Sequence, residues 1–344
     1  MAPTDTAGRA VAWAVVGLGG YARERMLPAL RRARGTRLAG VYTRSELVRT
    51  RVAAEYGVRG YGSLQAILED PAVDLVYLAT PHDLHAAQTV ACAVAGKHVL
   101  VEKPMAVSEA EAGAMVDACT RAGVTLRVGF QFRYHPAHRH ARALLASSEI
   151  GDLVWAAARW SAYRPADTGW RLDLGRAGGT LLTARGVHLI DLIRFVTDTE
   201  CVAVSGMSDG LRPESPADDV TVGLLALTSG AFAHVLCTRL VAGAEDGIEL
   251  YGTQGTIVCR STFGAEPGGT LVTRSAVAER RLSYDPCDLL VAQVESANDA
   301  VRGVPGPHPA ATGVDGARVV AVTTALVASV QTGRTVTLDR AGRG

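Results

Sequence analysis

Residues 11–22 read VAWAVVGLGGYA, and this stretch decides the fold of the N-terminal half. Six apolar residues of strand length run into a Gly-x-Gly-x-x-Ala motif. The first glycine of such a motif permits a tight turn, the second lets the backbone approach a pyrophosphate, and the alanine lets the following helix lie close to the sheet. The motif therefore predicts a dinucleotide site. The residues expected to line it are Gly17, Leu18, Gly19, Gly20, Tyr21 and Ala22.

Apolar runs of strand length alternate with segments of helical periodicity as far as Gly129. We expect strands at residues 11–16, 38–42, 75–79, 98–101 and 125–128. We expect helices at residues 21–33, 46–56, 84–95 and 108–122. Repeated strand-helix-strand units imply a parallel sheet that is covered on both faces. The fold class is therefore α/β, with a doubly wound Rossmann domain at residues 11–129 after a disordered tail at residues 1–10.

The pattern changes after Gly129, where β-rich runs are separated by Gly, Pro, Asp and Ser turns. Helices are expected at residues 136–146 and 186–196, and two closing helices at 289–302 and 314–331. Strands are expected at residues 153–163, 201–207, 220–227, 231–239, 247–251, 255–259 and 270–274. This pattern predicts an α+β domain at residues 130–344, with a mostly antiparallel sheet and helices on one face.

Composition excludes several classes of partner. Lys and Arg number 35 against 34 Asp and Glu, so no bulk charge favours nucleic acid or an anionic membrane. The six cysteines are far apart and lack C-x-x-C spacing, as is typical of reduced cysteines in a cytosolic protein. The N-terminus has no export pattern, and no uninterrupted apolar stretch approaches bilayer length. We therefore expect a cytoplasmic protein.

The end of the second expected strand bears on the choice of dinucleotide. The position where a carboxylate would hold the ribose 2′-hydroxyl carries instead Thr43, Arg44 and Ser45. A guanidinium with neighbouring hydroxyls suits a 2′-phosphate, so NADP(H) is favoured over NAD(H). The alternative is that Arg44 stacks on the adenine or faces solvent, which leaves the use of both cofactors open.

Two further loops follow strands at the same edge of the sheet. Lys103 ends the run HVLVEKP at residues 98–104, where a lysine is costly if buried unpaired but well placed to bind a polar ligand. The loop TPHDLH at residues 80–85 follows the preceding strand. Such loops line the cofactor cleft, so we expect Thr80 and Pro81 near the cofactor, with Pro81 fixing the turn. His85 either lies beside the nicotinamide ribose or merely occupies the first turn of a helix.

In the second half, His188 and Asp191 lie three residues apart on one expected helix. At this spacing they share a helix face, so the carboxylate can orient the imidazole for proton transfer or help bind a polyol. The alternative for His188 is a hydrogen-bonded core histidine. Three more histidines, His135, His138 and His140, have no cysteine or carboxylate to complete a metal set, and we expect them on a solvated helix face.

Taken together, these elements resemble the Gfo/Idh/MocA oxidoreductases, the family of glucose-fructose oxidoreductase and inositol dehydrogenase. The matches run in order along the chain: residues 16–22, 80–85, 101–104, 129–134, 170–173, 178–179, 186–191 and 252–256. The resemblance implies a Rossmann domain followed by an open-faced domain whose sheet builds a homodimer or homotetramer. It also implies hydride exchange between a nicotinamide and a carbon bearing a hydroxyl or ketone on a sugar, aminosugar or cyclitol.

Carried over by position, the resemblance implies that Lys103 binds the reacting oxygen, that His188 exchanges its proton, and that Pro104 is cis. It places several side chains near the cofactor: Glu102, Gln131, Trp170 and Arg171, with Arg133 bordering the same cleft. One departure stands out, because Ala184 occupies the position where the family usually has an acidic residue. Either Asp191 takes part of that role, Arg185 or a water enters the site, or the chemistry is weakened. The extreme alternative is a non-catalytic NADP-sensing protein of the same fold.

Overall fold

The computed structural model describes residues 9–163, 170, 173–177, 181–211, 218–264, 266–306 and 310–338. It divides into two compact units, Met1–Gln131 with Asp288–Ala317, and Phe132–Cys287 with Arg318–Gly344. Each unit is described by itself. Residues 1–8, which make up most of the expected N-terminal tail, lie outside the described residues.

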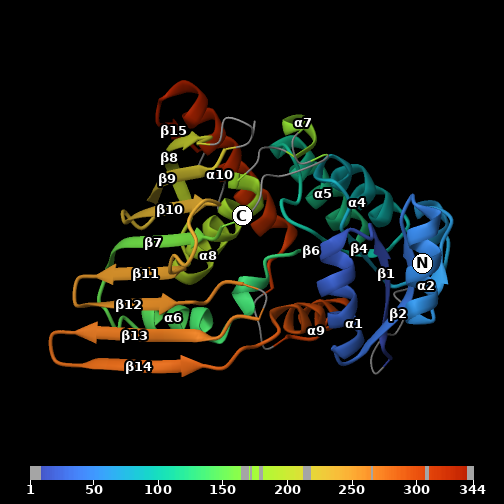
Figure 1. The fold of residues 1–344 in the computed structure, drawn as a ribbon, viewed down its shortest axis with the longest axis horizontal. Coiled ribbons are helices and arrows are strands. Elements are labelled where there is room, and N and C mark those ends of the chain that lie inside the picture. Colours follow the sequence, from blue (N-terminus) through green and yellow to red (C-terminus); the bar gives the residue numbers. More distant parts are fainter. Residues whose placement is uncertain are drawn as a thin grey trace. The chain divides into compact units, whose positions relative to one another are not determined.

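The first unit is built on a six-stranded parallel sheet of order β3-β2-β1-β4-β5-β6 (Figure 1). Its strands are β1 (Val11–Val16), β2 (Thr36–Tyr42), β3 (Arg59–Gly60), β4 (Leu75–Leu78), β5 (His98–Val101) and β6 (Leu126–Val128). Every residue of β1 and β4 is buried, as expected of strands covered on both faces. The strand order reverses between β1 and β4, and the carboxyl ends of strands at such a point are where dinucleotides bind in this class of fold.

Helices connect these strands, and their ends carry local signals. Ser45, Ser63 and Ser108 each accept a hydrogen bond from a backbone N–H in the first turn of α2, α3 and α5. Gly57 and Gly123 end α2 and α5 in the left-handed conformation. The helices are α1 (Leu27–Arg32), α2 (Glu46–Tyr56), α3 (Leu64–Leu68), α4 (His85–Val94) and α5 (Glu109–Ala122), with a π-helical segment, Ala22–Met26, before α1.

A late segment of the chain also belongs to the first unit. Helix α9 (Leu289–Val301) buries Leu290, Val294 and Ala297 in the same core as Trp13. Asn298, fully buried, accepts a 2.8 Å hydrogen bond from the Trp13 indole. The sequence placed 130–344 in a single domain, whereas the structure assigns residues 288–317 to the first unit. The reason is that α9 is the apolar cover for one face of the N-terminal sheet.

The second unit is built on a nine-stranded sheet of order β14-β13-β12-β11-β7-β10-β9-β8-β15. All neighbouring strands pair antiparallel except β7 and β10, which are parallel. The strands are β7 (Leu153–Ser161), β8 (Cys201–Asp209), β9 (Val220–Leu227), β10 (Phe232–Thr238), β11 (Gly247–Gly252), β12 (Gly255–Arg260), β13 (Gly269–Ser275), β14 (Glu279–Tyr284) and β15 (Val336–Thr337). The fold class expected from the sequence is confirmed.

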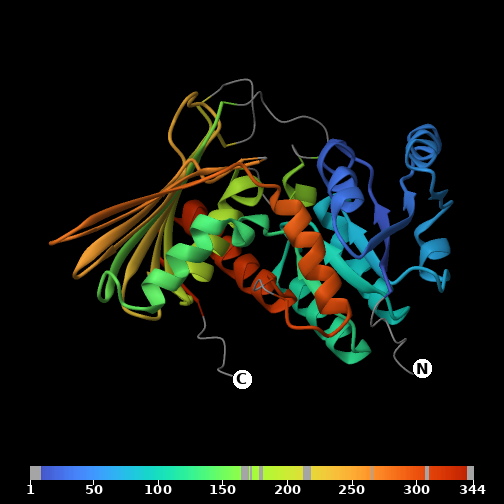
Figure 2. The ribbon, with the colours of Figure 1, turned by 90° about the horizontal axis from the view of Figure 1, so that it is seen from below.

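In the part of the chain that the structure describes, helices cover one face of this sheet and leave the other open (Figure 2). Helix α6 (Pro136–Ala146) lies against β12 and β13, and α8 (Val187–Thr197) against β7 and β10. Leu326 of α10 (Gly313–Thr332) contacts the glycines of β8 and β9. Successive side chains of a strand point to opposite faces, and Trp155 of β7 is exposed while its neighbour Ala156 is buried. The short α7 (Leu174–Ala177) completes the second unit.

Helix α10 is also long and apolar enough, by length and composition, to cross a membrane. Half of its most apolar window is buried inside the structure, with Val319, Leu326 and Ser329 almost fully covered. A core helix of a soluble protein has the same character, and Asp315 and Arg318 interrupt the apolar run.

Two histidines expected on a solvated helix face are instead fully buried at the start of α6. His138 donates from Nδ1 to the Phe132 carbonyl at 2.8 Å, which leaves Nε2 to accept from the Thr262 hydroxyl at 2.9 Å. His135 donates from Nε2 to the Gly268 carbonyl at 2.8 Å. The expectation was wrong because two of these partners, Gly268 and Thr262, lie more than 120 residues further along the chain, and no local pattern reveals such contacts.

The buried imidazoles of His135 and His138 should lower the free energy of unfolding in mild acid. Burial lowers the pKa of His138 to about 3 and also lowers the pKa of His135. Between pH 6.5 and about 3 the unfolded chain therefore binds more protons than the folded protein. The contribution of the buried histidine to the free energy of unfolding is fully present above pH 6.5 and is lost as pH falls through this window. We expect the His138 contribution to fall by roughly 2 kcal/mol between pH 7.5 and 5. Urea unfolding at both pH values measures it. His138→Asn keeps the donor to Phe132 without titrating and should show the smaller pH dependence; an equal loss in both proteins would contradict the assignment.

Candidate active site

The glycine loop of the first unit has the geometry that the sequence predicted. Gly17 has φ +94°, and a Cβ there would lie 2.4 Å from the Ala79 carbonyl oxygen, so only glycine fits beside β4. A Cβ at Gly19 would meet no described atom within 4 Å, which leaves the loop backbone open to an approaching phosphate. Ala22 is 1% exposed and seats the helix on the sheet. These residues fit a dinucleotide pyrophosphate.

The loop after β2 carries the residues expected to distinguish the two cofactors. Ser45 caps α2 by accepting from the Val48 amide at 3.4 Å, and Arg49 donates to the Thr43 carbonyl at 3.1 Å. Arg44 lies between them with an exposed side chain. An exposed guanidinium is compatible with binding a 2′-phosphate and with facing solvent, so the preference for NADP(H) stays a prediction.

The loop after β4 holds Thr80, Pro81 and His85. The Thr80 hydroxyl donates to the Gln88 side chain at 2.6 Å, and Pro81 precedes a single 3₁₀ turn. His85 is fully buried at the start of α4. Its Nδ1 lies 3.0 Å from the Pro104 carbonyl oxygen and its Nε2 lies 3.0 Å from the Thr80 carbonyl oxygen. The ring therefore links the loop after β4 to the loop after β5.

The loop after β5 carries Lys103, and the Lys103–Pro104 bond is cis as expected. Glu102 accepts a 2.6 Å hydrogen bond from the Tyr77 hydroxyl through Oε1 and a 3.3 Å bond from the Lys103 amide through Oε2. Burial raises the pKa of Glu102, while the charge of Lys103 acts in the opposite direction. Burial also raises the pKa of Tyr77 well above its usual value, with Glu102 adding to the effect. A cation, a carboxyl group and a phenol are thus gathered at the carboxyl edge of the sheet.

Lysines are scarce in this chain, which has only Lys97 and Lys103. Lys97 is 7% exposed and donates to the carbonyls of Asp70 and Val73 at 2.7 and 2.9 Å. It stands before β5 and Lys103 stands after it. Parallel strands carry their ligand sites at the carboxyl end, so only Lys103 is placed at the edge where the dinucleotide loop opens.

His188 of the second unit is set in an aromatic environment. It is 2% exposed on α8, a helix whose residues are all buried. Its ring centroid lies 5.0 Å from that of Phe132 and 5.6 Å from that of Trp160, both in edge-on arrangements. The sequence did not single out Trp160 or Phe132 as its neighbours, and their separation along the chain offers no local signal for the contact.

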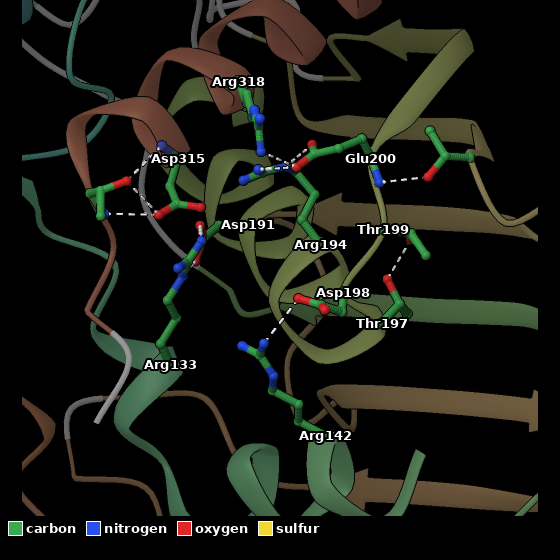
Figure 3. Close-up of polar contacts among 12 residues, drawn as sticks. Arg133, Arg142, Asp191, Arg194, Thr197, Asp198, Thr199, Glu200, Asp315 and Arg318 are labelled. Carbon is green, nitrogen blue, oxygen red and sulfur yellow. Dashed lines mark hydrogen bonds and ion pairs between the residues drawn. The ribbon is translucent and has the colours of Figure 1, made fainter. Parts of the chain in front are cut away.

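Asp191 has a partner that the sequence did not predict. Arg133 donates to it twice, from Nε to Oδ2 at 2.8 Å and from Nη2 to Oδ1 at 2.6 Å (Figure 3). Both side chains are at most 5% exposed. Two parallel charge-assisted bonds in a buried place fix both groups. The geometry thus supports Asp191 as the anchor of Arg133, while the catalytic role expected for Asp191 stays a prediction.

Ala184, where an acidic residue was expected, lies in a π-helical segment, Leu182–Gly186, that precedes α8. The next residue, Arg185, is 6% exposed and donates to the carbonyls of Thr238 and Ala162. Its guanidinium carbon lies 5.4 Å from the centre of the Trp160 ring. Arg185 thus lies against the Trp160 ring, which borders His188, while its guanidinium donates hydrogen bonds to backbone carbonyls.

Of the remaining expected site residues, the structure describes some and not others. Gln131 begins a 3₁₀ turn, Gln131–Tyr134, after β6, and Trp170 accepts a 3.2 Å bond from the Asp173 amide. Arg171 and the glycines at 178 and 179 lie outside the described residues. Lys103 belongs to the first unit and His188 to the second, so their meeting at one substrate atom stays a prediction.

Comparison with known proteins finds family models for both halves of the chain. A model of the oxidoreductase family with an NAD-binding Rossmann fold matches residues 11–130. A model of the GFO/IDH/MocA C-terminal domain matches residues 138–258.

Similar individual proteins match along nearly the whole chain. The 1,5-anhydro-D-fructose reductase of Ensifer adhaerens is 34% identical over 332 residues, covering 95% of this chain and 98% of that protein. The D-xylose 1-dehydrogenase (NADP(+)) 2 of Haloferax volcanii is 30% identical over 94% of this chain and 99% of that protein. The structure of an aldose-aldose oxidoreductase from Caulobacter crescentus in complex with glycerol superimposes with a TM-score of 0.87, at 26% identity, over 96% of this chain and all of that one.

Proposed function

This chain belongs to the GFO/IDH/MocA oxidoreductase family, and from that membership we propose that it transfers a hydride between NAD(P) and a hydroxyl- or ketone-bearing carbon of a sugar, aminosugar or cyclitol. The observation that carries this proposal is the pair of loops at the carboxyl edge of the first sheet. There the glycine loop, fit for a pyrophosphate, and the Glu102–Lys103–Pro104 loop follow strands of one parallel sheet. A bound nicotinamide would supply the carbon that gives or takes the hydride.

Lys103 provides the positive charge that the reaction needs. Oxidation of an alcohol develops negative charge on its oxygen, and a fixed ammonium stabilises that charge. The Glu102 carboxyl lies beside the Lys103 backbone and accepts from Tyr77, so the loop that presents the ammonium is anchored to the buried strand β4. In this account Tyr77 and Glu102 position the loop, and Lys103 binds the substrate oxygen.

His188 provides the proton acceptor in the oxidative direction. An imidazole has the right intrinsic proton affinity for this role at neutral pH. Phe132 and Trp160 hold its ring edge-on and reduce its exposure, which limits the orientations open to the ring. Ala184 has no carboxylate, and Asp191 is paired with Arg133. In this proposal His188 therefore takes the proton and Lys103 stabilises the negative charge on the substrate oxygen.

The substrate class follows from the similar proteins. Their names describe reduction of an anhydro-sugar ketone, oxidation of an aldose and transfer between aldoses. The same names favour catalysis over a nucleotide-sensing role. The test is absorbance at the reduced nicotinamide band with a panel of ketosugars, aldoses, aminosugars and inositols, each with NADPH, NADH and the oxidised cofactors. Turnover on at least one member supports the proposal. Cofactor binding without turnover on any member favours the sensor.

The cofactor preference has its own test. Arg44 is exposed at the end of β2, where a guanidinium can pair with a 2′-phosphate. We expect Arg44→Ala to weaken NADPH binding by about 10-fold or more, since a charge-assisted contact is lost, and to leave NADH binding nearly unchanged. Fluorescence titration of both cofactors measures the difference. Equal losses for NADPH and NADH would remove the assignment.

The open face of the second sheet suggests how the protein assembles. Trp155 stacks on Tyr251 with ring centroids 4.6 Å apart, and Phe232, Leu224 and Met207 are exposed on neighbouring strands. A sheet face of this size with exposed aromatic and aliphatic side chains favours burial against another protein surface. We propose a homodimer or homotetramer formed through this sheet, in the cytoplasm.

A further inference from the structure

His85 has an unusual pair of partners for a buried histidine. Its Nδ1 and Nε2 each lie 3.0 Å from a backbone carbonyl oxygen, of Pro104 and of Thr80 respectively. A carbonyl oxygen can only accept, so each of these contacts is a hydrogen bond only if the ring nitrogen carries a proton. The Pro104 carbonyl follows directly after Lys103, and Thr80 follows β4. One ring therefore connects two neighbouring loops at the carboxyl edge of the sheet.

The ring has one N–H to share between these carbonyls at neutral pH. Burial lowers the pKa of His85 to about 4, although hydrogen bonds with the Pro104, Thr80 and Met105 backbone and the Asp83 carboxylate oppose this effect. The imidazole of His82 lies 5.6 Å away, centroid to centroid. A neutral imidazole donates from one nitrogen and presents a lone pair at the other. One of the two 3.0 Å contacts is thus a hydrogen bond. In the other, the lone pair of a ring nitrogen faces a carbonyl oxygen.

Burial decides which of the two carbonyls accepts the hydrogen bond from the ring N–H. The contact with Pro104 is buried, and Pro104 itself is buried. The contact with Thr80 is only partly buried, and Thr80 is half-exposed. A buried carbonyl without a donor is costly, whereas a half-exposed one can be hydrated. The favoured tautomer therefore carries its proton on Nδ1 and donates to Pro104.

We propose that His85 is a positioning residue for the reaction, which holds the backbone of the Lys103 loop in place through a hydrogen bond from Nδ1 to the Pro104 carbonyl. This inference rests on the proposed function of Lys103 and adds a residue that acts through it. Because His85 is fully buried and both ring nitrogens lie against backbone carbonyls, we assign it no contact with the reacting atoms. Its loss therefore moves the ammonium without removing it.

Two substitutions separate the two contacts. In His85→Asn the side-chain amide nitrogen takes the place of Nδ1, and in His85→Gln it takes the place of Nε2. We expect kcat to fall by less than about 5-fold in the Asn variant, because the donor to Pro104 is kept. We expect kcat to fall about 100-fold in the Gln variant, because a misplacement of about 1 Å at a reacting group has an effect of this size. NADPH affinity should change by less than about 3-fold in both.

Three kinetic outcomes would overturn the proposal. Equal kcat in the Asn and Gln variants would reduce His85 to a packing role. A better Gln than Asn variant would transfer the function to the Thr80 contact. A loss that appears in cofactor affinity alone would make His85 part of the nucleotide site. If wild-type protein shows no turnover on the whole sugar panel, the proposed function fails first, and the following measurements still decide the role of His85.

Two measurements do not depend on activity. In protein labelled with ¹⁵N at its nine histidines, the His85 resonances, identified by their loss in His85→Asn, should show the proton on Nδ1. Reductive methylation with ¹³C-formaldehyde gives Lys103 a resonance that Lys103→Arg assigns. That resonance should shift in His85→Gln and keep its wild-type position in His85→Asn. A proton on Nε2, or an unmoved Lys103 resonance in the Gln variant, would contradict the proposal even if neither variant turned over.

Discussion

Lys103→Met is expected to lower kcat for the best sugar substrate by roughly 10³-fold, the upper range for losing a single group that stabilises a developing oxyanion. Methionine keeps much of the length of the side chain and removes only the charge. NADPH binding, measured by fluorescence titration, should stay within about 3-fold of wild type, since the phosphates are met by the glycine loop and not by Lys103. Turnover is measured at the reduced nicotinamide band.

Lys97→Arg is the matched control, because Lys97 is the only other lysine in the chain. It lies before β5 and donates to the Asp70 and Val73 carbonyls. Arginine keeps its charge and its capacity to donate, so kcat should stay close to wild type. Unchanged turnover in Lys103→Met, or an equal loss in Lys97→Arg, would count decisively against the role given to Lys103.

Asp191→Asn is expected to destabilise the second unit by about 3–5 kcal/mol, the usual effect of removing one partner of a buried ion pair. Arg133 would keep its charge in a place where it is 5% exposed and would lose the carboxylate that accepts two of its hydrogen bonds. The free energy of unfolding is measured in urea. A variant that still folds should retain most of its turnover per folded molecule, because His188 and Lys103 are intact.

Asp198→Asn is the matched control at the end of the same helix. Asp198 pairs with Arg142 (Figure 3). Its side chain is 82% exposed, and its left-handed conformation suits asparagine equally well. An exposed pair contributes only about 0–1 kcal/mol, so this change should be nearly neutral. A small loss of stability in Asp191→Asn together with a loss of kcat above about 100-fold would instead return Asp191 to the catalytic role that its spacing from His188 suggested.

The sequence predicted the first sheet well because each signal there is local. The strand VAWAVV, its glycine turn and the serine caps act over fewer than ten residues, and the alternation of strands and helices implies the parallel order. Strands β14 and β15 of the second sheet were not predicted, and β14 was missed for the opposite reason. Residues ERRLSY of β14 form an edge strand with exposed, charged side chains, so no apolar pattern marks them.

The candidate site was predictable in its residue types but less so in its partners. Lys103, His188 and the glycine loop could be found from motifs, whereas the Arg133–Asp191 pair joins residues 58 positions apart. The role of Tyr77 could not be predicted, because it is one of four buried residues in β4 and a tyrosine in a buried strand fits the apolar strand pattern. The placement of His85 and His138 depends on the backbone carbonyls of Pro104 and Phe132, and a carbonyl has no signature in the sequence.

We expect the Lys103 ammonium and the His188 imidazole to act on one substrate oxygen. A crystal structure of the protein with NADPH and a non-reducible analogue of its best sugar substrate tests this most directly. In that complex, the Lys103 Nζ and a ring nitrogen of His188 should both lie about 3 Å from the same oxygen of the sugar, beside the nicotinamide ring. A sugar that contacts only one of them, or a wall of side chains between the two, would contradict it.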